Sequence, residues 1–410
     1  MSEYHINLHE AIYSLSDALD LVGVTHIHHG KRVAYMAVEF GKMLGWERSR
    51  LDKLFQAAIL HDCGVSRTTV HEKLAQFEWE EESEHCRAGA ALLATCPLLS
   101  GLSPIVLHHH THWSSLEEMD LPVEEKLSAN CIYMADRVDI LTLGYLAGNI
   151  DILLGKEEIR RKVAEKSGEW FCSDLAEAFL EISCSEAFWF SLESDHVSGF
   201  VATWLSETKA APMSFPELRS LARVFSSIVD AKSPFTKEHS DRVAALSRHI
   251  GTLFGLSEKT CEMLELAGLL HDIGKLRIPD ALLEKPGKFT DAERVTVLRH
   301  SFDTYNILRN IRGMEEISLW AAQHHERLDG TGYPYHLKKR ALSFEARIVE
   351  VADVFQALAQ RRPYRESLPA EKIMDNLTEE AGRGRLDEKV VAKVGSNLRA
   401  CWEVAMGSAG

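Results

Sequence analysis

The chain of 410 residues carries 61 acidic and 46 basic residues, which gives a formal net charge of −15, and 45% of its residues are hydrophobic. A chain of this length exceeds one typical hydrophobic core and suggests two domains. The net negative charge argues against a protein that coats long nucleic acids, because binding their phosphates requires a strongly basic surface. A small anionic substrate remains compatible with it if metal ions and a few cations concentrate positive charge locally.

Nothing in the sequence predicts export or a membrane anchor. The first residues, Met1 to His5, lack the basic and apolar regions of a signal peptide. An uncharged stretch at 88–107 is interrupted by two prolines and a glycine, which favours two buried helix pieces over a membrane span. The eight cysteines form no CxxC pair, so we interpret them as buried thiols in a reducing compartment. We expect a soluble, cytoplasmic protein.

Apolar residues recur at helical spacing, and alternating strand patterns are nearly absent. In 241–254 and 258–270, for example, the apolar side chains fall three and four residues apart. This periodicity predicts an all-α protein built from packed antiparallel helices.

The chain also repeats itself with a period of about 210 residues. His29 and Arg32 recur as His239 and Arg242 at an offset of 210, and the apolar run that ends in His61-Asp62 recurs before His271-Asp272 at the same offset. Three further matches follow at slightly larger offsets: His85 with His300, His109-His110 with His324-His325, and Asp136 with Asp353. We interpret this as a duplicated domain, with a first domain at 1–205, a polar, proline-bearing linker at 206–217 and a second domain at 218–410.

The second half carries a pattern of metal ligands. An apolar run that ends in His271-Asp272 indicates a metal site, because unpaired buried charge is costly, whereas neutral imidazole and carboxylate are common ligands. Seven candidates are more than one four-coordinate ion needs, so two ions bridged by a carboxylate are expected, as in a dinuclear metallohydrolase. The candidates are His239, His271, Asp272, His300, His324, His325 and Asp353. Isolated histidines, such as His196, His249 and His336, are interpreted as non-ligands.

These residues resemble the HD superfamily of metal-dependent phosphohydrolases. The run from His324 to Pro334, with its Gly332-Tyr333-Pro334 triplet, is similar to the HD-GYP subfamily, and the likeness covers roughly 218–395. The resemblance implies two tandem helical HD domains in which the first lacks the GYP triplet. It also implies two divalent ions, with iron or manganese favoured, and hydrolysis of a cyclic dinucleotide, a bacterial second messenger, to the linear dinucleotide.

The same resemblance assigns roles to individual residues. One ion would be held by His239, His271, Asp272 and Asp353, the other by His300, His324 and His325, with Asp272 bridging. A third ion, which some members hold on a glutamate, is not expected, because Phe235 stands at that position. Lys275 would act with Asp272 in catalysis, either by stabilising charge that develops on phosphorus or by assisting the leaving oxygen. Substrate contacts are expected from Arg362, Arg365, Gln356, Gly332, Tyr333 and Pro334.

One departure from the family pattern bears on the substrate. Gln356 stands where the family often has an aspartate three residues after the metal-binding aspartate. A carboxylate suits the N–H edge of guanine, whereas an amide both donates and accepts and so matches adenine. This favours 3′,3′-cGAMP over c-di-GMP, which stays the alternative. The GYP loop could also contact a diguanylate-cyclase-type partner, and a homodimer is compatible with the sequence.

The first half preserves a second possible metal set but not the rest of the pattern. Val65 stands where Lys275 stands, no GYP triplet follows His110, and no arginine-rich run follows Asp136. Three hypotheses remain: a structural or regulatory metal site, a 5′-phosphomonoesterase that acts on the linear product, or a domain without metal. The candidate ligands are His29, His61, Asp62, His85, His109, His110 and Asp136.

Two other functions are alternatives to a cyclic-dinucleotide phosphodiesterase. A general nucleotide phosphohydrolase would not need the intact Gly332-Tyr333-Pro334 triplet or Arg362 and Arg365. A non-catalytic receptor for the messenger would not need a complete ligand set together with Lys275. The sequence therefore favours the phosphodiesterase.

Overall fold

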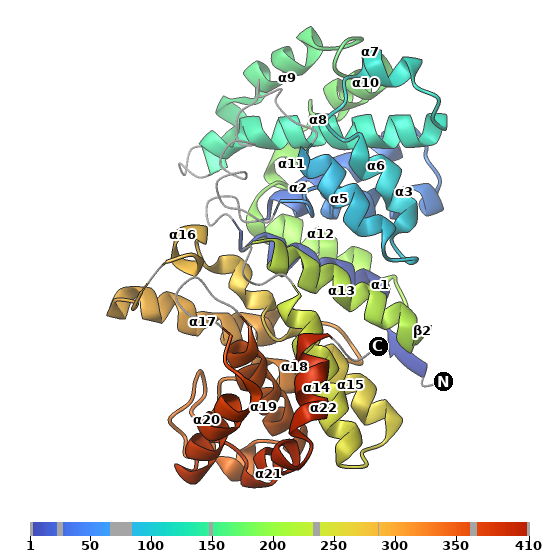
Figure 1. The fold of residues 1–410 in the computed structure, drawn as a ribbon. Helices are drawn as coiled ribbons and strands as arrows, with labels where there is room; N and C mark the ends of the chain where they lie inside the picture. Colours follow the sequence, from blue (N-terminus) through green and yellow to red (C-terminus); the bar gives the residue numbers. More distant parts are fainter. Residues whose placement is uncertain are drawn as a thin grey trace. The chain divides into compact units, whose positions relative to one another are not determined.

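The computed structural model describes residues 3–22, 28–65, 84–146, 151–232, 238–285, 287–360 and 367–407. Within these ranges the regular elements are helices apart from one two-stranded sheet (Figure 1). The chain divides into two compact units: residues 7–209, called here the N-terminal unit, and residues 1–6 together with 210–410, called here the C-terminal unit. The expected all-α fold class is confirmed for the described residues.

The N-terminal unit is built around a buried central helix, α2, which packs mainly against α3 and α8. Val33, Met36, Ala37 and Phe40 of α2 are fully buried, so this helix forms the middle of the core. The elements are α1 (Leu8–Leu19), α2 (His29–Met43), α3 (Arg48–Ile59), α5 (Glu84–Ala94), η1 (Ser100–Leu102), α6 (Ser103–Leu107), α7 (Trp113–Glu118), α8 (Val123–Leu146), η2 (Ile152–Leu154), α9 (Lys156–Glu165), α10 (Ser173–Ile182), α11 (Glu186–Phe190) and α12 (Ser194–Ser206).

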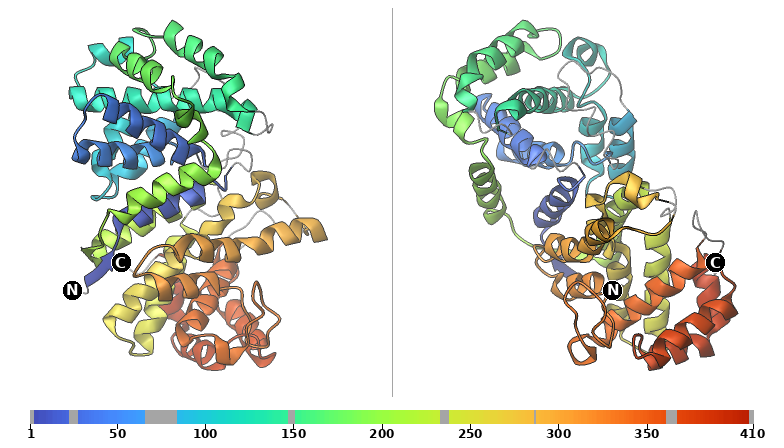
Figure 2. Two further views of the ribbon diagram at one scale, coloured as in Figure 1. Left: turned by 180° about the vertical axis from the view of Figure 1, so that it is seen from behind. Right: turned by 90° about the vertical axis from the view of Figure 1, so that its left-hand side faces the viewer.

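The C-terminal unit has a similar plan, with α14 packed against α15 and α19 (Figure 2). Gly268 of α15 allows the close approach, because a Cβ there would lie 2.6 Å from the Cα of Ala244 in α14. The elements are β1 (Glu3–Ile6), β2 (Ala211–Ser214), α13 (Phe215–Ala231), α14 (His239–Leu253), α15 (Glu258–Leu270), η3 (Ile273–Arg277), α16 (Asp280–Leu283), α17 (Asp291–Leu308), α18 (Glu315–Ala322), η4 (Lys339–Ala341), α19 (Phe344–Ala359), α20 (Ala370–Gly382), α21 (Glu388–Ser396) and α22 (Leu398–Met406).

The first residues of the chain belong to the C-terminal unit because β1 pairs antiparallel with β2, with Tyr4 opposite Met213. The Tyr4 hydroxyl donates a 2.8 Å hydrogen bond to Glu262 of α15, which fixes the strand to the helical core. The expected linker at 206–217 therefore contains β2 and the first turn of α13. That helix begins at a capping box between Ser214 and Glu217. Its proline, Pro216, lies in the first turn, where a missing amide proton is tolerated.

None of the described helices is long and apolar enough to cross a bilayer.

Candidate active site

Seven side chains from five parts of the C-terminal unit converge on one buried cluster. His239 opens α14, His271 and Asp272 follow α15, His300 lies in α17, His324 and His325 follow α18, and Asp353 lies in α19. Their ligand atoms form three overlapping groups in which all atoms lie within 4.8 Å of one another. The groups are His239, His271 and Asp353; His271, Asp272 and His324; and His300, His324 and His325. The structure thus brings together every ligand that the sequence predicts for this half.

Asp272 lies between two sets of histidines. Its Oδ2 is 3.1 Å from Nε2 of His271 and 3.9 Å from Nε2 of His239. Its Oδ1 is 3.6 Å from Nε2 of His300 and 3.7 Å from Nε2 of His324. One carboxylate that offers one oxygen to each set is suited to bridge two cations.

Hydrogen bonds to the backbone hold the imidazole rings with one nitrogen facing inward. Nδ1 of His271, His300 and His324 lies 2.8, 2.6 and 2.7 Å, respectively, from the carbonyl oxygen three residues earlier. A carbonyl only accepts, so Nδ1 carries a proton in each ring, and in the neutral ring Nε2 directs its lone pair at the cluster. This is the usual way in which outer contacts fix the tautomer of a metal ligand.

Two buried atoms in the cluster support a metal site. Oδ1 of Asp272 is buried and makes no hydrogen bond among the described residues, and Nε2 of His271 is buried and faces the carboxylates of Asp272 and Asp353 at 3.1 and 3.8 Å. Buried polar atoms without a partner are costly and uncommon, and a cation would satisfy both. Imidazole together with carboxylate is a donor set that first-row divalent ions accept. The residues present therefore fit the metal ions that the HD resemblance implies.

The protonation states in the cluster are largely those that metal binding requires. Burial lowers the pKa of His300 to about 4 and that of His324 to about 3. Burial opposes ionisation of Asp272, but His271 and Lys275 together hold the pKa of Asp272 well below its ordinary value. His271 differs: burial lowers its pKa, but Asp272 and Asp353 outweigh burial and raise it. A cation that binds at His271 would therefore displace a proton there.

A lysine side chain lies beside the bridging carboxylate. Nζ of Lys275, in η3, lies 2.5 Å from Oδ2 of Asp272, and the Lys275 side chain is 21% exposed. The turn that carries both residues is fixed by Thr304 of α17, whose Oγ1 donates to the His271 carbonyl at 3.0 Å and accepts from the Gly274 amide at 3.1 Å. The predicted catalytic lysine is thus held at the partly open side of the cluster.

The Gly332-Tyr333-Pro334 loop packs directly against the ligand histidines. The Tyr333 ring lies 4.8 Å from the His325 ring, and the Tyr333 amide donates to the His325 carbonyl at 3.0 Å. Glu326 supports the loop by accepting from two backbone amides beyond it, at 2.7 and 2.8 Å. Gly332 is required because a Cβ there would lie 2.2 Å from a backbone nitrogen. The triplet therefore forms a wall of the cluster.

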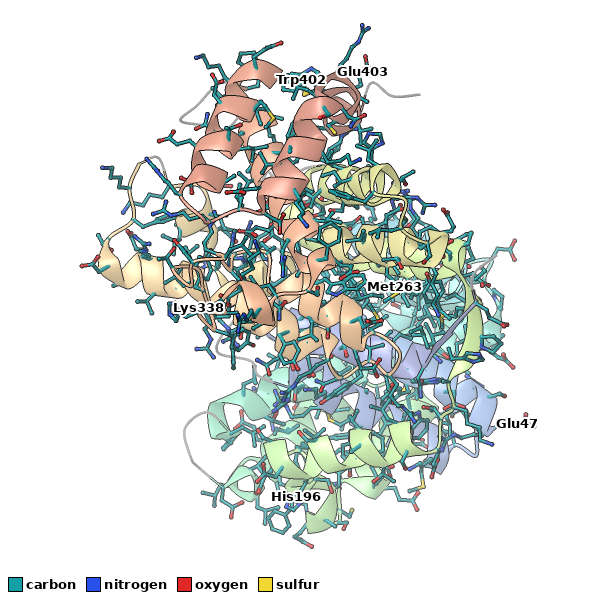
Figure 3. All side chains as sticks on the ribbon, turned by 90° about the horizontal axis from the view of Figure 1, so that it is seen from below. Glu47, His196, Met263, Lys338, Trp402 and Glu403 are labelled. Atoms are coloured by element: carbon teal, nitrogen blue, oxygen red, sulfur yellow. The ribbon has the colours of Figure 1, made fainter. Side chains whose placement is uncertain are left out.

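The remaining predicted contacts fall into two classes. Gln356 lies one turn after Asp353 on α19; it is only 4% exposed, and its Oε1 has no hydrogen-bond partner among the described residues. Arg362 and Arg365, and also Phe235, lie outside the described residues. His196, which the sequence predicts to be a non-ligand, is exposed on α12 (Figure 3).

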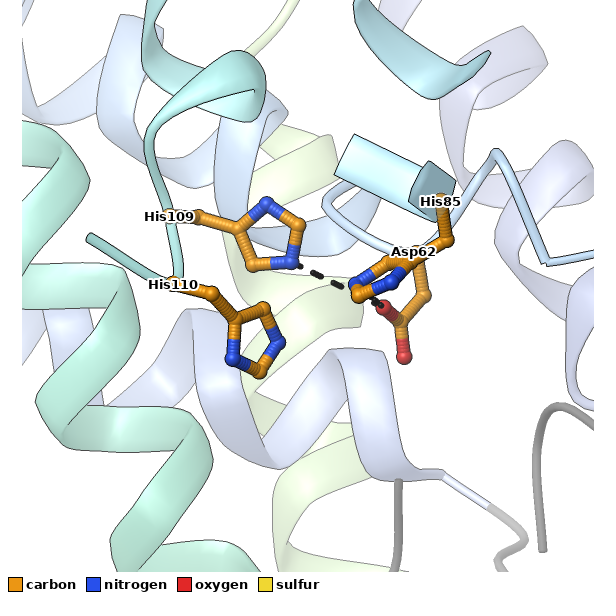
Figure 4. Close-up of side chains that lie close together, drawn as sticks. All are labelled: Asp62, His85, His109 and His110. Atoms are coloured by element: carbon orange, nitrogen blue, oxygen red, sulfur yellow. Dashed lines mark ion pairs between the residues drawn. The ribbon is translucent and has the colours of Figure 1, made fainter. Parts of the chain in front are cut away.

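The N-terminal unit contains a second cluster of the same design. Its ligand atoms form two groups, each within 4.8 Å: Asp62, His85, His109 and His110, and His29, His61 and Asp136. Figure 4 shows the four side chains of the first group directed toward one another. Oδ1 of Asp62 lies 3.6 Å from His85 and 3.7 Å from His109, and its Oδ2 lies 3.7 Å from His29 and 3.5 Å from His61. Asp62 thus occupies the same bridging position as Asp272.

Three ion pairs distinguish the N-terminal cluster, and none of them was predicted from the sequence. Nδ1 of His29 lies 2.7 Å from Asp139, whose carboxylate also binds the guanidinium of Arg32 at 2.5 Å. Arg137 donates to Asp136 at 2.6 Å. The signal that could have revealed Asp139 is its spacing, three residues after Asp136, which is the spacing of Gln356 after Asp353.

In the C-terminal cluster the corresponding partners differ. Gln356 stands at the position of Asp139, and Nδ1 of His239, the counterpart of His29, makes no hydrogen bond among the described residues. Val354 stands at the position of Arg137. The ligands of the N-terminal cluster are therefore backed by buried carboxylate–arginine pairs. The equivalent positions of the C-terminal cluster hold an amide and an apolar side chain.

A small cavity of about 30 Å³ lies beside the N-terminal cluster, lined by His29, His61, Asp62, Val65 and Asp20 among others. A cavity needs about 10–15 Å³ to hold a water molecule. A water molecule therefore fits beside the bridging carboxylate of this unit.

Comparisons with known proteins agree with both clusters. Residues 27–141 and residues 223–390 each match an HD domain family. The chain is 35% identical, over 98% of its length and 95% of the relative, to 3′3′-cGAMP-specific phosphodiesterase 1 of Vibrio cholerae. It is 31% identical, over 61% of its length and 73% of the relative, to the cyclic di-GMP phosphodiesterase response regulator RpfG of Xanthomonas campestris.

The fold is also similar to a solved structure, described as a cyclic GMP-AMP specific phosphodiesterase of V. cholerae (V-cGAP3). The TM-score is 0.64 at 24% identity, over 97% of this chain and 98% of that one. With its two HD domains and a relative that matches it from end to end, the chain belongs to the family of HD-domain cyclic-dinucleotide phosphodiesterases.

Proposed function

We propose that this protein hydrolyses a cyclic dinucleotide to the linear dinucleotide at the cluster of the C-terminal unit. The observation that carries the proposal is the position of Asp272, whose two oxygens face two separate histidine sets while Lys275 adds a cation at the partly open side. The sequence relatives support the same reaction class, because their names describe cyclic-dinucleotide phosphodiesterases.

The ligand sets divide the cluster into two metal positions. His239, His271, Asp272 and Asp353 would hold one ion, and His300, His324 and His325 would share Asp272 and hold the other. Divalent cations bound in pairs lower the pKa of water and neutralise phosphoryl oxygens. Iron or manganese is favoured by the family resemblance, and this donor set accepts both.

The chain's own residues would bind and orient the anionic substrate. Lys275 supplies a compact positive charge next to the reacting phosphate, where it stabilises charge that increases in the transition state. Tyr333 and Pro334 form a wall that excludes water from one side of the cluster, and Arg362 and Arg365 would bind phosphate oxygens. Contact of this loop with a diguanylate-cyclase-type partner, and formation of a homodimer, stay predictions.

We infer 3′,3′-cGAMP as the preferred substrate and c-di-GMP as the alternative. Two lines support cGAMP: the amide of Gln356 suits adenine, and the relative that matches over 98% of the chain is named as cGAMP-specific. The alternative substrate, c-di-GMP, is supported by a relative that is named as a cyclic di-GMP phosphodiesterase. The burial of Gln356 means that any base contact would have to form deep in the site.

Product chromatography after incubation of the metal-loaded protein with each cyclic dinucleotide tests the proposal. A linear dinucleotide is the expected product, and it should disappear in an Asp272→Asn variant but persist in the matched Asp62→Asn variant of the other unit. Mononucleotide products would indicate a general nucleotide phosphohydrolase instead. Unchanged substrate in the wild type would indicate a receptor.

For the N-terminal unit we infer metal binding and, as a second candidate function, a phosphomonoesterase that acts on the linear product. Two groups of possible ligand atoms lie close together in this unit, and the cavity beside Asp62 has room for a water molecule that could act as nucleophile. Release of phosphate from linear pApG tests this function. It should be lost in a His61→Ala/Asp62→Ala variant and retained in the matched His271→Ala/Asp272→Ala variant. Equal phosphate release by all three proteins, or no release by the wild type, would contradict the phosphomonoesterase function. A structural or regulatory role would then remain for this unit.

A further inference from the structure

One cysteine faces the N-terminal cluster. Cys86 follows His85 on α5 and is 1% exposed. Its Sγ lies 3.5 Å from Nε2 of His85 and 3.9 Å from Nε2 of His109. These are the two nitrogens that face Oδ1 of Asp62 at 3.6 and 3.7 Å, so the thiol lies on the same side as the ligand atoms.

The spacing of these atoms fits ligands that share one ion. With a metal–sulfur distance of about 2.3 Å, a metal–nitrogen distance of about 2.0–2.1 Å and a tetrahedral angle, a sulfur and a nitrogen ligand lie about 3.5 Å apart. The two separations from Cys86 are 3.5 and 3.9 Å, so the thiol needs little movement to join His85 and His109 around a cation.

A hydrogen-bonding thiol explains the same contacts less completely. Nδ1 of His109 already donates to the Val106 carbonyl at 2.6 Å, so in the neutral ring its Nε2 is an acceptor. A thiol has one proton and can donate to only one of the two imidazoles. It would also leave Oδ1 of Asp62, which is buried, without a hydrogen-bond partner. A single cation satisfies all four atoms.

The duplication supplies an internal comparison. Ser301 follows His300 as Cys86 follows His85, and its Oγ lies 3.3 Å from Nε2 of His300. The C-terminal unit therefore has a hydroxyl at the position in its cluster where the N-terminal unit has a thiol. A neutral hydroxyl is a weak ligand, whereas a thiolate is a strong one and selects thiophilic ions.

We propose that Cys86 is a thiolate ligand of the metal site in the N-terminal unit, together with Asp62, His85 and His109. This unit then prefers Zn²⁺ or another thiophilic divalent ion, whereas the nitrogen and oxygen ligands of the C-terminal unit impose no such preference. Binding releases the thiol proton to solvent. The proposal rests on metal binding by the N-terminal unit and deepens it by naming the class of ion.

Titration of the metal-free full-length protein with Co²⁺ under anaerobic conditions tests the proposal, because a thiolate ligand gives a sulfur-to-cobalt charge-transfer band in the near ultraviolet. The wild type and an Asp272→Asn variant, whose C-terminal site is impaired, should both show the band. Cys86→Ser should lose it while keeping the visible ligand-field absorption of bound cobalt. Cys63→Ser removes a buried thiol that bonds no described histidine, and it should keep the band. Ser301→Cys should add a second band from the C-terminal unit.

The outcomes separate the two levels of the proposal. Cobalt bound by the N-terminal unit without the band, or a band that survives in Cys86→Ser, would overturn the role of Cys86 alone. No cobalt bound by this unit in Asp272→Asn would overturn metal binding itself. A second readout is selectivity: Cys86→Ser should lower Zn²⁺ affinity by at least the roughly tenfold that loss of an outer-shell partner costs, and lower Mn²⁺ affinity much less. Equal losses for both ions would contradict the proposal.

Discussion

Replacing Gly274 by alanine tests how the fold positions the C-terminal cluster. Gly274 lies between Asp272 and Lys275, where the turn after α15 touches α17. A Cβ at this position would lie 2.0 Å from the carbonyl oxygen of His300 and 2.9 Å from the amide nitrogen of Thr304. Gly274 is not among the glycines with positive φ, so the obstacle is contact with α17 and not the backbone conformation.

The size of the effect follows from these distances. Since non-bonded contacts of this kind need roughly 3 Å or more, α17 must move by about 1 Å. Overpacking of this kind costs about 1–3 kcal/mol, and loss of the hydrogen bond from the Gly274 amide to Thr304 adds about 1 kcal/mol. Moving His300 by about 1 Å should also lower turnover by about 100-fold.

Three measurements on Gly274→Ala check this reasoning: free energy of unfolding of the metal-free protein, metal content per chain, and rate of cyclic-dinucleotide hydrolysis. Gly382→Ala is the matched control, because a Cβ there meets nothing within 4 Å in α20, and it should be neutral or stabilising by up to about 1 kcal/mol. Gly64→Ala, whose Cβ would lie 2.1 Å from the His85 carbonyl oxygen, should disturb only the N-terminal cluster. A Gly274→Ala protein with wild-type stability, metal content and turnover would refute the argument.

Three other predictions concern single side chains of the same cluster. Lys275→Met should lower turnover by about 10²–10³-fold with the metal content retained, because it removes charge stabilisation in the transition state; loss of metal instead would mean that Lys275 orients Asp272. Gln356→Asp should shift the ratio of hydrolysis rates from 3′,3′-cGAMP toward c-di-GMP, and an unchanged ratio would contradict a role in base selection. Burial lowers the pKa of His300 to about 4, so between pH 6.5 and pH 4 the unfolded chain binds more protons than the folded one. Stability of the metal-free protein should therefore fall as pH is lowered through this window, and His300→Gln should flatten the dependence in chemical denaturation; equal slopes would show that other groups control it.

Much of the candidate site could be predicted because metal ligands are specified by residue type and order. The offset of about 210 residues pairs His61-Asp62 with His271-Asp272, and in both pairs the aspartate lies between two sets of histidines in the structure. The helical periodicity likewise predicted the all-α class. These features are encoded locally, since a ligand type and a helical repeat are both visible within a short stretch of sequence.

Contacts between distant segments could not be predicted in this way. The pairing of Tyr4 with Met213, which assigns the first residues to the C-terminal unit, joins segments about 200 residues apart, and no local pattern marks it. Asp139 was missed as the partner of His29 because the contact depends on how α8 packs against α2.

The sequence by itself determined which residue types could bind metal, their order along two repeated domains and the helical class of the fold. Only the tertiary structure decided which oxygen of Asp272 faces which histidine, and that the thiol of Cys86 faces the same cluster as the predicted ligand His85 beside it. The physical reason is that coordination and hydrogen bonding depend on the positions of atoms to within a few tenths of an ångström. Those positions are set by the packing of helices that lie far apart in the chain.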